Sequence, residues 1–447
     1  MAHSARVLVA NGNLQALNHV SGCLRRLGYI NLLETAVDKA VSRAQAERPE
    51  VIFVGHEFSD RDCASIISDI KNDVATRDIP VFLTCGENES PPWSESWVTR
   101  FDGVIQWPFE DEHIQAHMRA GLRLGTMRAE LNRRSETLNR LGLESGEKWR
   151  AETTEGHPRV LLVRGENGDG DATEDALKGF ALLQTQIFGS GIVDQLSDSD
   201  VELVVIAANN NFPAAVAICE EIRCNPALFH MPILAICSGD PDQISVVYRH
   251  GATPAYSLPL VGDEIRARVS MGVTAHRLRG YMLNAYRAAW RQAVSDSATG
   301  LFSVEFFRQH LQTLVDDAFR WDKNLSLNIM AVPEIDQIWN EYGDAAATHL
   351  TKQLGAKISQ LVRGEDLCAR LDNTTFCIAL PESPLEATSP TMQRLTAVLR
   401  TTEFSLVGVS KPLIVRPTFG SVEFRPGDTV DDLLDRATSA ALAKHAA

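Results

Sequence analysis

An arginine and an aspartate three positions apart, Arg363 and Asp366, stand immediately before a predicted hairpin. Only Gly364 and Glu365 separate them, so both side chains can emerge from one turn. A guanidinium can donate two hydrogen bonds to O6 and N7 of a guanine, and a carboxylate can accept from guanine N–H groups. The pattern by itself indicates a binding site only weakly, because residues 425–428 repeat it in an ordinary turn.

The hairpin is predicted from two apolar runs around a polar tip. Residues 367–371 read LCARL, residues 376–380 read FCIAL, and the tip runs from Asp372 to Thr375. Apolar segments that flank Asx residues are typical of a β-hairpin. We therefore expect the hairpin to hold the preceding turn in place.

The hairpin and the turn before it resemble the centre of the GGDEF, or diguanylate cyclase, family. In that family the tip reads Gly-Gly-Asp/Glu-Glu-Phe, and an Arg-x-x-Asp five residues upstream is the inhibitory site for cyclic di-GMP. Here residues 367–371 give the same offset, but only Phe376 of the tip is kept. The resemblance implies that Arg363 and Asp366 bind the dinucleotide, with Arg394 completing the site from a neighbouring helix. The alternative is an exposed ion pair, which would contribute about 0 to 1 kcal/mol.

The catalytic positions of the family carry other residue types in this chain. Ala331 stands where the resemblance implies a magnesium-binding aspartate, and Trp339 and Asn340 stand where an Asn and an Asp hold the guanine of GTP. We expect the indole to fill that pocket. Thr374 and Thr375 replace the second metal ligand and the acid near the reacting hydroxyl. Two divalent ions must offset the triphosphate charge when cyclic di-GMP is made from GTP. We therefore expect no catalytic residue, no metal and no catalytic cofactor. We expect cyclic di-GMP to be a regulatory ligand.

Upstream, residues 1 to about 125 and 158 to about 273 each alternate apolar strands with amphipathic helices. Such alternation predicts, in each segment, a parallel sheet of five strands with helices on both faces. Both segments resemble response-regulator receiver domains, in which an aspartate ending the third strand accepts a phosphoryl group. Gly55 and Ala207 occupy that position here. The resemblance therefore implies degenerate receivers that serve dimerisation and docking.

The magnesium-binding acidic pair of a receiver is also replaced in both segments. Asn11 stands in its place in the first segment, and Arg164 stands there in the second. Between the segments, residues 110 to 142 have a long helical pattern rich in Arg and Leu, followed by a polar linker. A second long pattern leads from the second segment into the C-terminal part of the chain.

The sequence thus predicts an α/β protein with two doubly wound, five-stranded parallel receiver domains of the CheY type. An α/β GGDEF domain of the nucleotide-cyclase palm type follows them. The predicted boundaries are residues 1–140 for the first receiver with its extended helix, 141–157 for the linker, 158–292 for the second receiver, and 293–447 for the GGDEF domain.

Composition narrows the classes of partner. The 447 residues are 44% hydrophobic and 23% charged, enough for about three domains. A net charge of -15 argues against nucleic acid or anionic membrane as an obligatory partner. The eight cysteines lack Cys-x-x-Cys spacing, which favours reduced thiols. Since no apolar run approaches the roughly 18 residues of a membrane span, we expect a cytoplasmic protein.

The resemblances together imply a catalytically inactive effector that binds cyclic di-GMP and acts through protein contacts, as a homodimer. The layout of two receivers and a GGDEF domain, with phosphoryl transfer and cyclase activity both lost, further implies a role at the cell pole in the cell cycle. In that role the protein would be an adaptor that helps present regulatory substrates to the ClpXP protease. Three alternatives remain. They are a residual diguanylate cyclase making cyclic di-GMP from GTP with magnesium or manganese, a phosphorelay receiver, and a nucleotide-independent scaffold.

Overall fold

The protein was analysed as a computed structural model, which describes most of the chain. It covers residues 5–56, 63–86, 93, 101–143, 156–289 and 294–445, except 167, 169, 190, 198, 209–210, 226–227, 229, 239–240, 253–254 and 258–259. The chain divides into two compact units. Unit 1 comprises residues 1–125 and 148–278, and unit 2 comprises residues 126–147 and 279–447. Most of the predicted linker lies outside the described residues.

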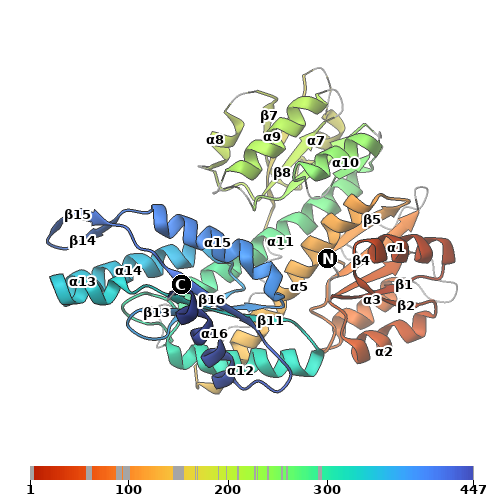
Figure 1. The fold of residues 1–447 in the computed structure, drawn as a ribbon. Helices are drawn as coiled ribbons and strands as arrows, with labels where there is room; N and C mark the ends of the chain where they lie inside the picture. Colours follow the sequence, from red (N-terminus) through yellow and green to blue (C-terminus); the bar gives the residue numbers. More distant parts are fainter. Residues whose placement is uncertain are drawn as a thin grey trace. The chain divides into compact units, whose positions relative to one another are not determined.

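Unit 1 begins with a parallel sheet of five strands, in the order β2-β1-β3-β4-β5 (Figure 1). Two separate apolar clusters, one on each face, form its core. The strands are β1 (Arg6–Ala10), β2 (Ile30–Glu34), β3 (Val51–Gly55), β4 (Val81–Gly86) and β5 (Gly103–Trp107). The accompanying helices are α1 (Leu14–Arg26), α2 (Val37–Glu47), α3 (Cys63–Asn72) and the start of α5 (Asp111–Arg140).

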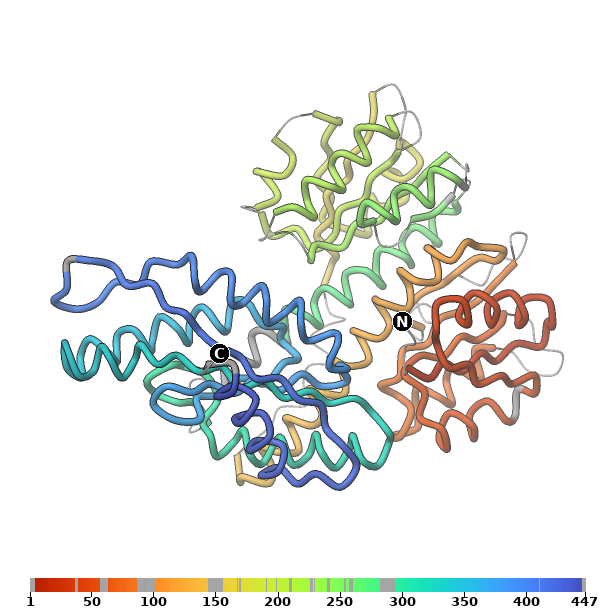
Figure 2. The backbone as a smooth tube through the Cα atoms, viewed as in Figure 1, coloured from red at the N-terminus to blue at the C-terminus, as the bar shows by residue number. Residues whose placement is uncertain are grey.

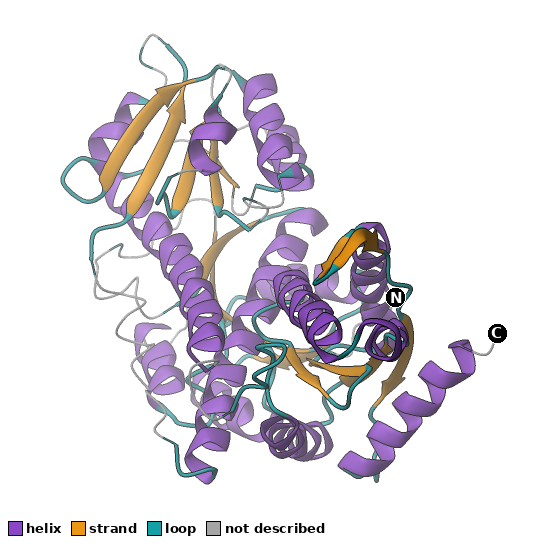
Figure 3. Ribbon diagram, turned by 90° about the vertical axis from the view of Figure 1, so that its left-hand side faces the viewer, coloured by secondary structure: helices purple, strands orange, loops and turns teal. Residues whose placement is uncertain are grey.

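The second sheet of unit 1 has the same topology, because β10-β9-β8-β6-β7 is the first order read from the other edge. Figure 3 shows its strands side by side with helices around them. The strands are β6 (Arg159–Arg164), β7 (Leu182–Ile187), β8 (Leu203–Ala207), β9 (Ile233–Cys237) and β10 (Ala255–Ser257). The helices are α7 (Asp171–Leu177), α8 (Ile192–Ser197), α9 (Phe212–Cys224), α10 (Pro241–Arg249) and α11 (Gly262–Ala289).

The predicted duplication of a five-stranded parallel fold is therefore confirmed. The central strands β3 and β8 are buried along their whole length, as continuous apolar runs predict. The strands β2 and β7 next to β1 and β6 are edge strands with partly exposed side chains, so their sequences carry the weakest apolar pattern.

Unit 2 is built on an antiparallel sheet in the order β12-β13-β11-β16. The predicted hairpin is confirmed as β12 (Leu367–Arg370) and β13 (Thr375–Pro381), and the other strands are β11 (Leu325–Ala331) and β16 (Thr418–Glu423). One face packs against α12 (Val304–Trp321) and α16 (Val430–His445). The other packs against α13 (Glu334–Tyr342), α14 (Asp344–Leu361) and α15 (Leu385–Thr401). A small hairpin of β14 (Phe404–Leu406) and β15 (Val409–Leu413) follows α15.

Helix α5 confirms the predicted long helical segment, and Figure 2 traces its backbone. It begins in unit 1, but residues 126–140 belong to unit 2, where they pack on α12 and on the loops at the ends of the sheet. The helix is thus shared by both units through its covalent continuity. Of the helices in the described residues, none is long and apolar enough to cross a bilayer.

Candidate functional site

The Arg363–Asp366 segment forms a closed turn between the end of α14 and the start of β12. The Asp366 carboxylate accepts a hydrogen bond from the Arg363 backbone N–H at 2.8 Å. In return, the Arg363 carbonyl accepts from the Asp366 N–H at 3.2 Å. Because both bonds lie within four residues, the spacing of the motif fixes the backbone of this turn locally.

The two side chains of the motif have different environments. Arg363 is exposed, whereas Asp366 is only 2% exposed. The expectation that both side chains emerge from the turn is therefore wrong for Asp366, whose carboxylate turns back to cap the Arg363 N–H. Burial, and next the neighbouring Glu365, raise the pKa of the Asp366 carboxyl to about 7, although the hydrogen bond from Arg363 and the charges of Arg363 and Arg134 act the other way.

The third predicted residue, Arg394, comes from α15, a helix packed beside α14. It is exposed, and its Nη2 donates to the carbonyl oxygen of Leu361 at 2.9 Å. Leu361 is the last residue of α14, two positions before Arg363. The structure therefore places Arg394 at the base of the turn, where its guanidinium also caps the C-terminus of a helix.

The hairpin tip is satisfied by its own hydrogen bonds. Thr374 N–H donates to the Asp372 carboxylate at 2.9 Å. The Arg370 guanidinium donates to the carbonyl oxygens of Asp372 at 2.9 Å and Asn373 at 3.2 Å. The tip residues Thr374 and Thr375 therefore take part in a structural turn, with Thr375 opening β13.

The remaining positions predicted to have lost catalytic function lie at strand and helix ends. Ala331 ends β11 and pairs with Thr375 across the sheet. Trp339 and Asn340 lie on α13 and are exposed, Trp339 by 56%. The indole therefore does not fill a pocket in this structure, which corrects that expectation. Sequence reasoning could not foresee this because exposure depends on how α13 packs as a whole.

The first receiver-like sheet has no room at the phosphoacceptor position. A Cβ atom added at Gly55 would lie 2.4 Å from Cγ of Asn11. The Asn11 side chain is fixed there, since its Nδ2 donates to Thr84 Oγ1 at 3.2 Å and its Oδ1 accepts from the Asn13 N–H at 2.8 Å. An aspartate at residue 55 would require Asn11 to move.

The second receiver-like sheet has a cation where an acidic pair would hold magnesium. Ala207 ends the buried strand β8. Arg164, at the end of β6, pairs with Asp171 at 2.5 Å and with Glu174 at 3.1 Å. The nearby carboxylates therefore neutralise Arg164. Among the described residues, no group of three or more His, Cys, Asp or Glu side chains could hold a metal ion.

One residue of the site was missed by the sequence analysis. Arg134, on α5, donates through Nη2 to the carbonyl oxygens of Glu365 at 3.2 Å and Asp366 at 3.1 Å. It is more than 200 positions away in the chain, and its sequence context is a generic Arg-rich helix. The only available indication was that so basic a helix must place some guanidinium groups against carbonyl or carboxylate partners.

Comparisons with known proteins agree with this architecture. Residues 293–446 match the family model described as diguanylate cyclase, GGDEF domain. Over 446 residues the chain is 24% identical to the response regulator PleD of Caulobacter vibrioides, a match that covers 97% of this chain and 95% of PleD. A match of 150 residues, also at 24% identity, is to the diguanylate cyclase DgcP of Pseudomonas aeruginosa and covers 34% of this chain and 22% of DgcP.

Among solved structures, the GGDEF domain of DgcB from Caulobacter crescentus, in complex with c-di-GMP, is 15% identical with a TM-score of 0.34. That match covers 35% of this chain and 92% of the DgcB domain. The C-terminal part of the chain is a GGDEF domain, and the two parallel sheets before it are receiver-like. The whole chain is similar to PleD in layout and sequence.

Proposed function

We propose that this protein is a cyclic di-GMP effector that binds the dinucleotide at the Arg363 turn of its GGDEF domain and acts through protein contacts. The observation that carries the proposal is an exposed guanidinium on a locally closed turn, with a second exposed guanidinium, Arg394, hydrogen-bonded to the base of that turn. Two cations beside one turn, one from the turn and one from α15, suit a ligand with two phosphates and two guanines.

In this proposal Arg363 contacts the ligand, and Asp366 chiefly holds the turn that presents it. The guanidinium of Arg363 is free to pair with O6 and N7 of one guanine, the geometry that arginine adopts with that base. Arg394 supplies positive charge for a phosphate. The Asp366 carboxylate keeps the Arg363 backbone in place through its 2.8 Å hydrogen bond.

We further propose that the domain does not synthesise cyclic di-GMP. Ala331 and Thr374 offer no carboxylate for the two metal ions on which phosphoryl transfer between nucleotides depends. The alternative is a residual cyclase. Incubating the pure protein with GTP and either magnesium or manganese, followed by chromatography, distinguishes the two. Accumulation of cyclic di-GMP beyond a no-protein blank would refute inactivity.

In lacking the residues for both phosphoryl transfer and cyclase activity, the chain resembles PopA, a paralogue of PleD. On that resemblance we propose a homodimeric adaptor, located at the cell pole, that helps present cell-cycle regulators to the ClpXP protease. The test is degradation of a candidate regulator by purified ClpXP, with and without this protein and cyclic di-GMP. Rates that do not depend on the protein would contradict the adaptor role, and a monomer mass in sedimentation would contradict the dimer.

Calorimetry with cyclic di-GMP tests the binding site. The wild type is expected to bind, and Arg363→Ala is expected to weaken binding by about 10- to 100-fold, the value of a bidentate arginine–guanine pair. Arg425→Ala is the matched control, because residues 425–428 form the same motif elsewhere in the domain. Equal binding by the wild type and Arg363→Ala would refute the site, and no binding by the wild type would refute the function.

A further inference from the structure

The C-terminal half of α5 docks on unit 2 through a buried charged cluster. Glu130 is fully buried and accepts from Arg134 Nε at 2.8 Å and from His310 Nε2 of α12 at 2.8 Å. The other ring nitrogen of His310 lies 2.9 Å from Thr137 Oγ1. Burial opposes ionisation, but the charges of His310 and Arg134 hold the pKa of Glu130 at about 2. The cluster is therefore an ion pair with directional partners.

Arg134 connects this cluster to the Arg363 turn. Its Nε is fixed by Glu130, which leaves Nη2 directed at the carbonyl oxygens of Glu365 and Asp366. Its guanidinium also lies over the ring of Phe302, 5.6 Å from the ring centroid. The Phe302 N–H in turn donates to the Cys368 carbonyl oxygen at 3.0 Å, at the start of β12. The guanidinium thus holds two carbonyl groups of the turn, in addition to the bond between the Arg363 N–H and the Asp366 carboxylate.

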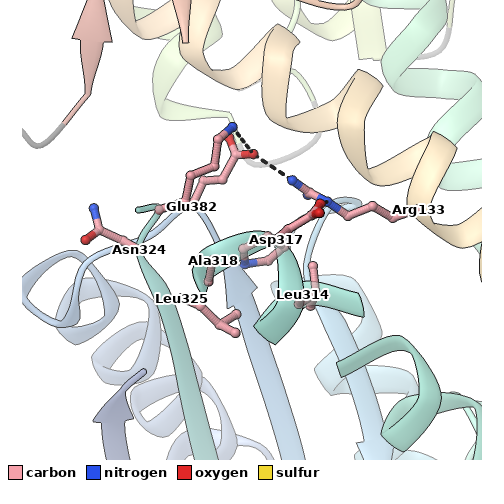
Figure 4. A pocket seen from close by; sticks show the side chains of 9 residues that line it. Arg133, Leu314, Asp317, Ala318, Asn324, Leu325 and Glu382 are labelled. Atoms are coloured by element: carbon pink, nitrogen blue, oxygen red, sulfur yellow. Dashed lines mark hydrogen bonds and ion pairs between the residues drawn. The ribbon is translucent and has the colours of Figure 1, made fainter. Parts of the chain in front are cut away.

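A second set of contacts fixes the same helix near the end of β13 (Figure 4). Arg133 pairs with Asp317 of α12 at 2.7 Å and with Glu382 at 2.9 Å. Glu382 also accepts from Lys323 at 3.0 Å and from Thr126 Oγ1 at 2.8 Å. These charges hold the pKa of Glu382 well below its usual range, despite burial. With two separate anchors, residues 126–140 have one defined docked position on the domain.

We propose that the docked segment 126–140 of α5 regulates ligand binding at the Arg363 turn, with Arg134 holding the turn in its binding conformation. This inference rests on the proposed function. Linkage requires reciprocity: if docking of α5 favours the ligand, the ligand favours docking of α5 by the same free energy. Ligand binding would thereby stabilise the docked end of α5, a helix that begins in unit 1 after the last strand of the first receiver-like sheet.

Two physical effects give the coupling its sign. Arg134 fixes two carbonyl groups of the turn, so its removal leaves the turn more mobile and the ligand must then order it. Its positive charge also favours the ionised Asp366 carboxylate that caps the Arg363 N–H. Both effects predict weaker ligand binding without Arg134.

The test is calorimetry with cyclic di-GMP on the full chain carrying Arg134→Met, together with hydrogen exchange of the wild type. Arg134→Met is expected to weaken binding by about tenfold. Arg140→Met, on the same helix but bonded to Thr313, is the matched control and is expected to bind like the wild type. Ligand is expected to slow amide exchange in residues 126–140 of the wild type, a measurement that needs no variant to fold.

The outcomes separate this inference from the proposed function. If the wild type binds, but Arg134→Met binds equally well and exchange in residues 126–140 does not respond to ligand, the coupling is refuted and the binding function stands. If the wild type does not bind, both are refuted. An equal loss of affinity in Arg134→Met and Arg140→Met would also refute a specific role for Arg134.

Discussion

Two turns of the same domain, residues 363–366 and 425–428, share one sequence pattern and the same two hydrogen bonds between the arginine and the aspartate. In each, the aspartate accepts from the backbone N–H of the arginine at 2.8 Å. They differ in what surrounds the aspartate. Asp366 is buried, and a distant arginine binds the carbonyl groups of its turn. Asp428 is half-buried, and its carboxylate pairs with Arg436 of the following helix.

The comparison shows that Arg-x-x-Asp specifies a turn and that tertiary packing decides what the turn can do. The local hydrogen bonds follow from four residues and occur in both places. The long-range partners, Arg134 and Arg394, contact the first turn because α5 and α15 each place an arginine beside it. We therefore expect substitutions to affect the two turns differently.

The largest difference is expected in stability. Because the folded state raises the pKa of Asp366 to about 7, this group takes up a proton on folding between its unfolded pKa and 7. Its favourable contribution is full at low pH, falls as pH rises through this window, and is lost above about 7. At pH 8 the free energy of unfolding of Asp366→Asn should therefore exceed that of the wild type by on the order of 2 kcal/mol.

The control for that experiment is the same pair measured at pH 4.5, where the advantage of Asp366→Asn should be only about a quarter of its value at pH 8. Chemical denaturation followed by circular dichroism gives both values. A gap that is unchanged between the two pH values would show that Asp366 does not titrate in this window.

The next difference is expected in ligand binding. Asp366→Ala removes the acceptor that holds the Arg363 backbone, so cyclic di-GMP affinity should fall by about tenfold. Asp428→Ala makes the identical change in the second turn and should leave affinity unaltered. Calorimetry of the two variants side by side decides this, and a similar loss in both would mean that the effect comes from general loosening of the domain.

The smallest difference concerns the second turn alone. Asp428→Asn removes the partner of Arg436, a pair near the surface, and should destabilise the domain by about 0.5 kcal/mol at neutral pH. The sign is opposite to that expected for Asp366→Asn at pH 8. The effect should shrink in high salt, because salt screens exposed pairs. A stabilising effect of Asp428→Asn would contradict the contrast between the two turns.

Much of the fold could be predicted from the sequence because it follows from local periodicity. The buried strands β3 and β8 are continuous apolar runs, and the β12–β13 hairpin is two apolar runs around an Asx-rich tip. The long helix α5 also has a clear helical pattern. The edge strands β2 and β7 have a weaker apolar pattern because their side chains are exposed or half-buried.

The site could be predicted only in part, because burial depends on residues far apart in the chain. The offset of Arg363 from the hairpin is a local feature, and so is the turn it forms. The burial of Asp366 and the exposure of Trp339 arise from helix packing that no spacing reveals. The contact of Arg134 with the turn joins residues more than 200 positions apart, and only the folded structure brings them together.

The most direct test of binding at the Arg363 turn is photo-crosslinking with a reactive cyclic di-GMP analogue, followed by peptide mapping of the full-length protein. Crosslinks are expected in peptides that contain Arg363 or Arg394, and unlabelled cyclic di-GMP should compete with them. Crosslinks confined to the hairpin tip and α13, or to the turn at residues 425–428, would contradict binding at the Arg363 turn.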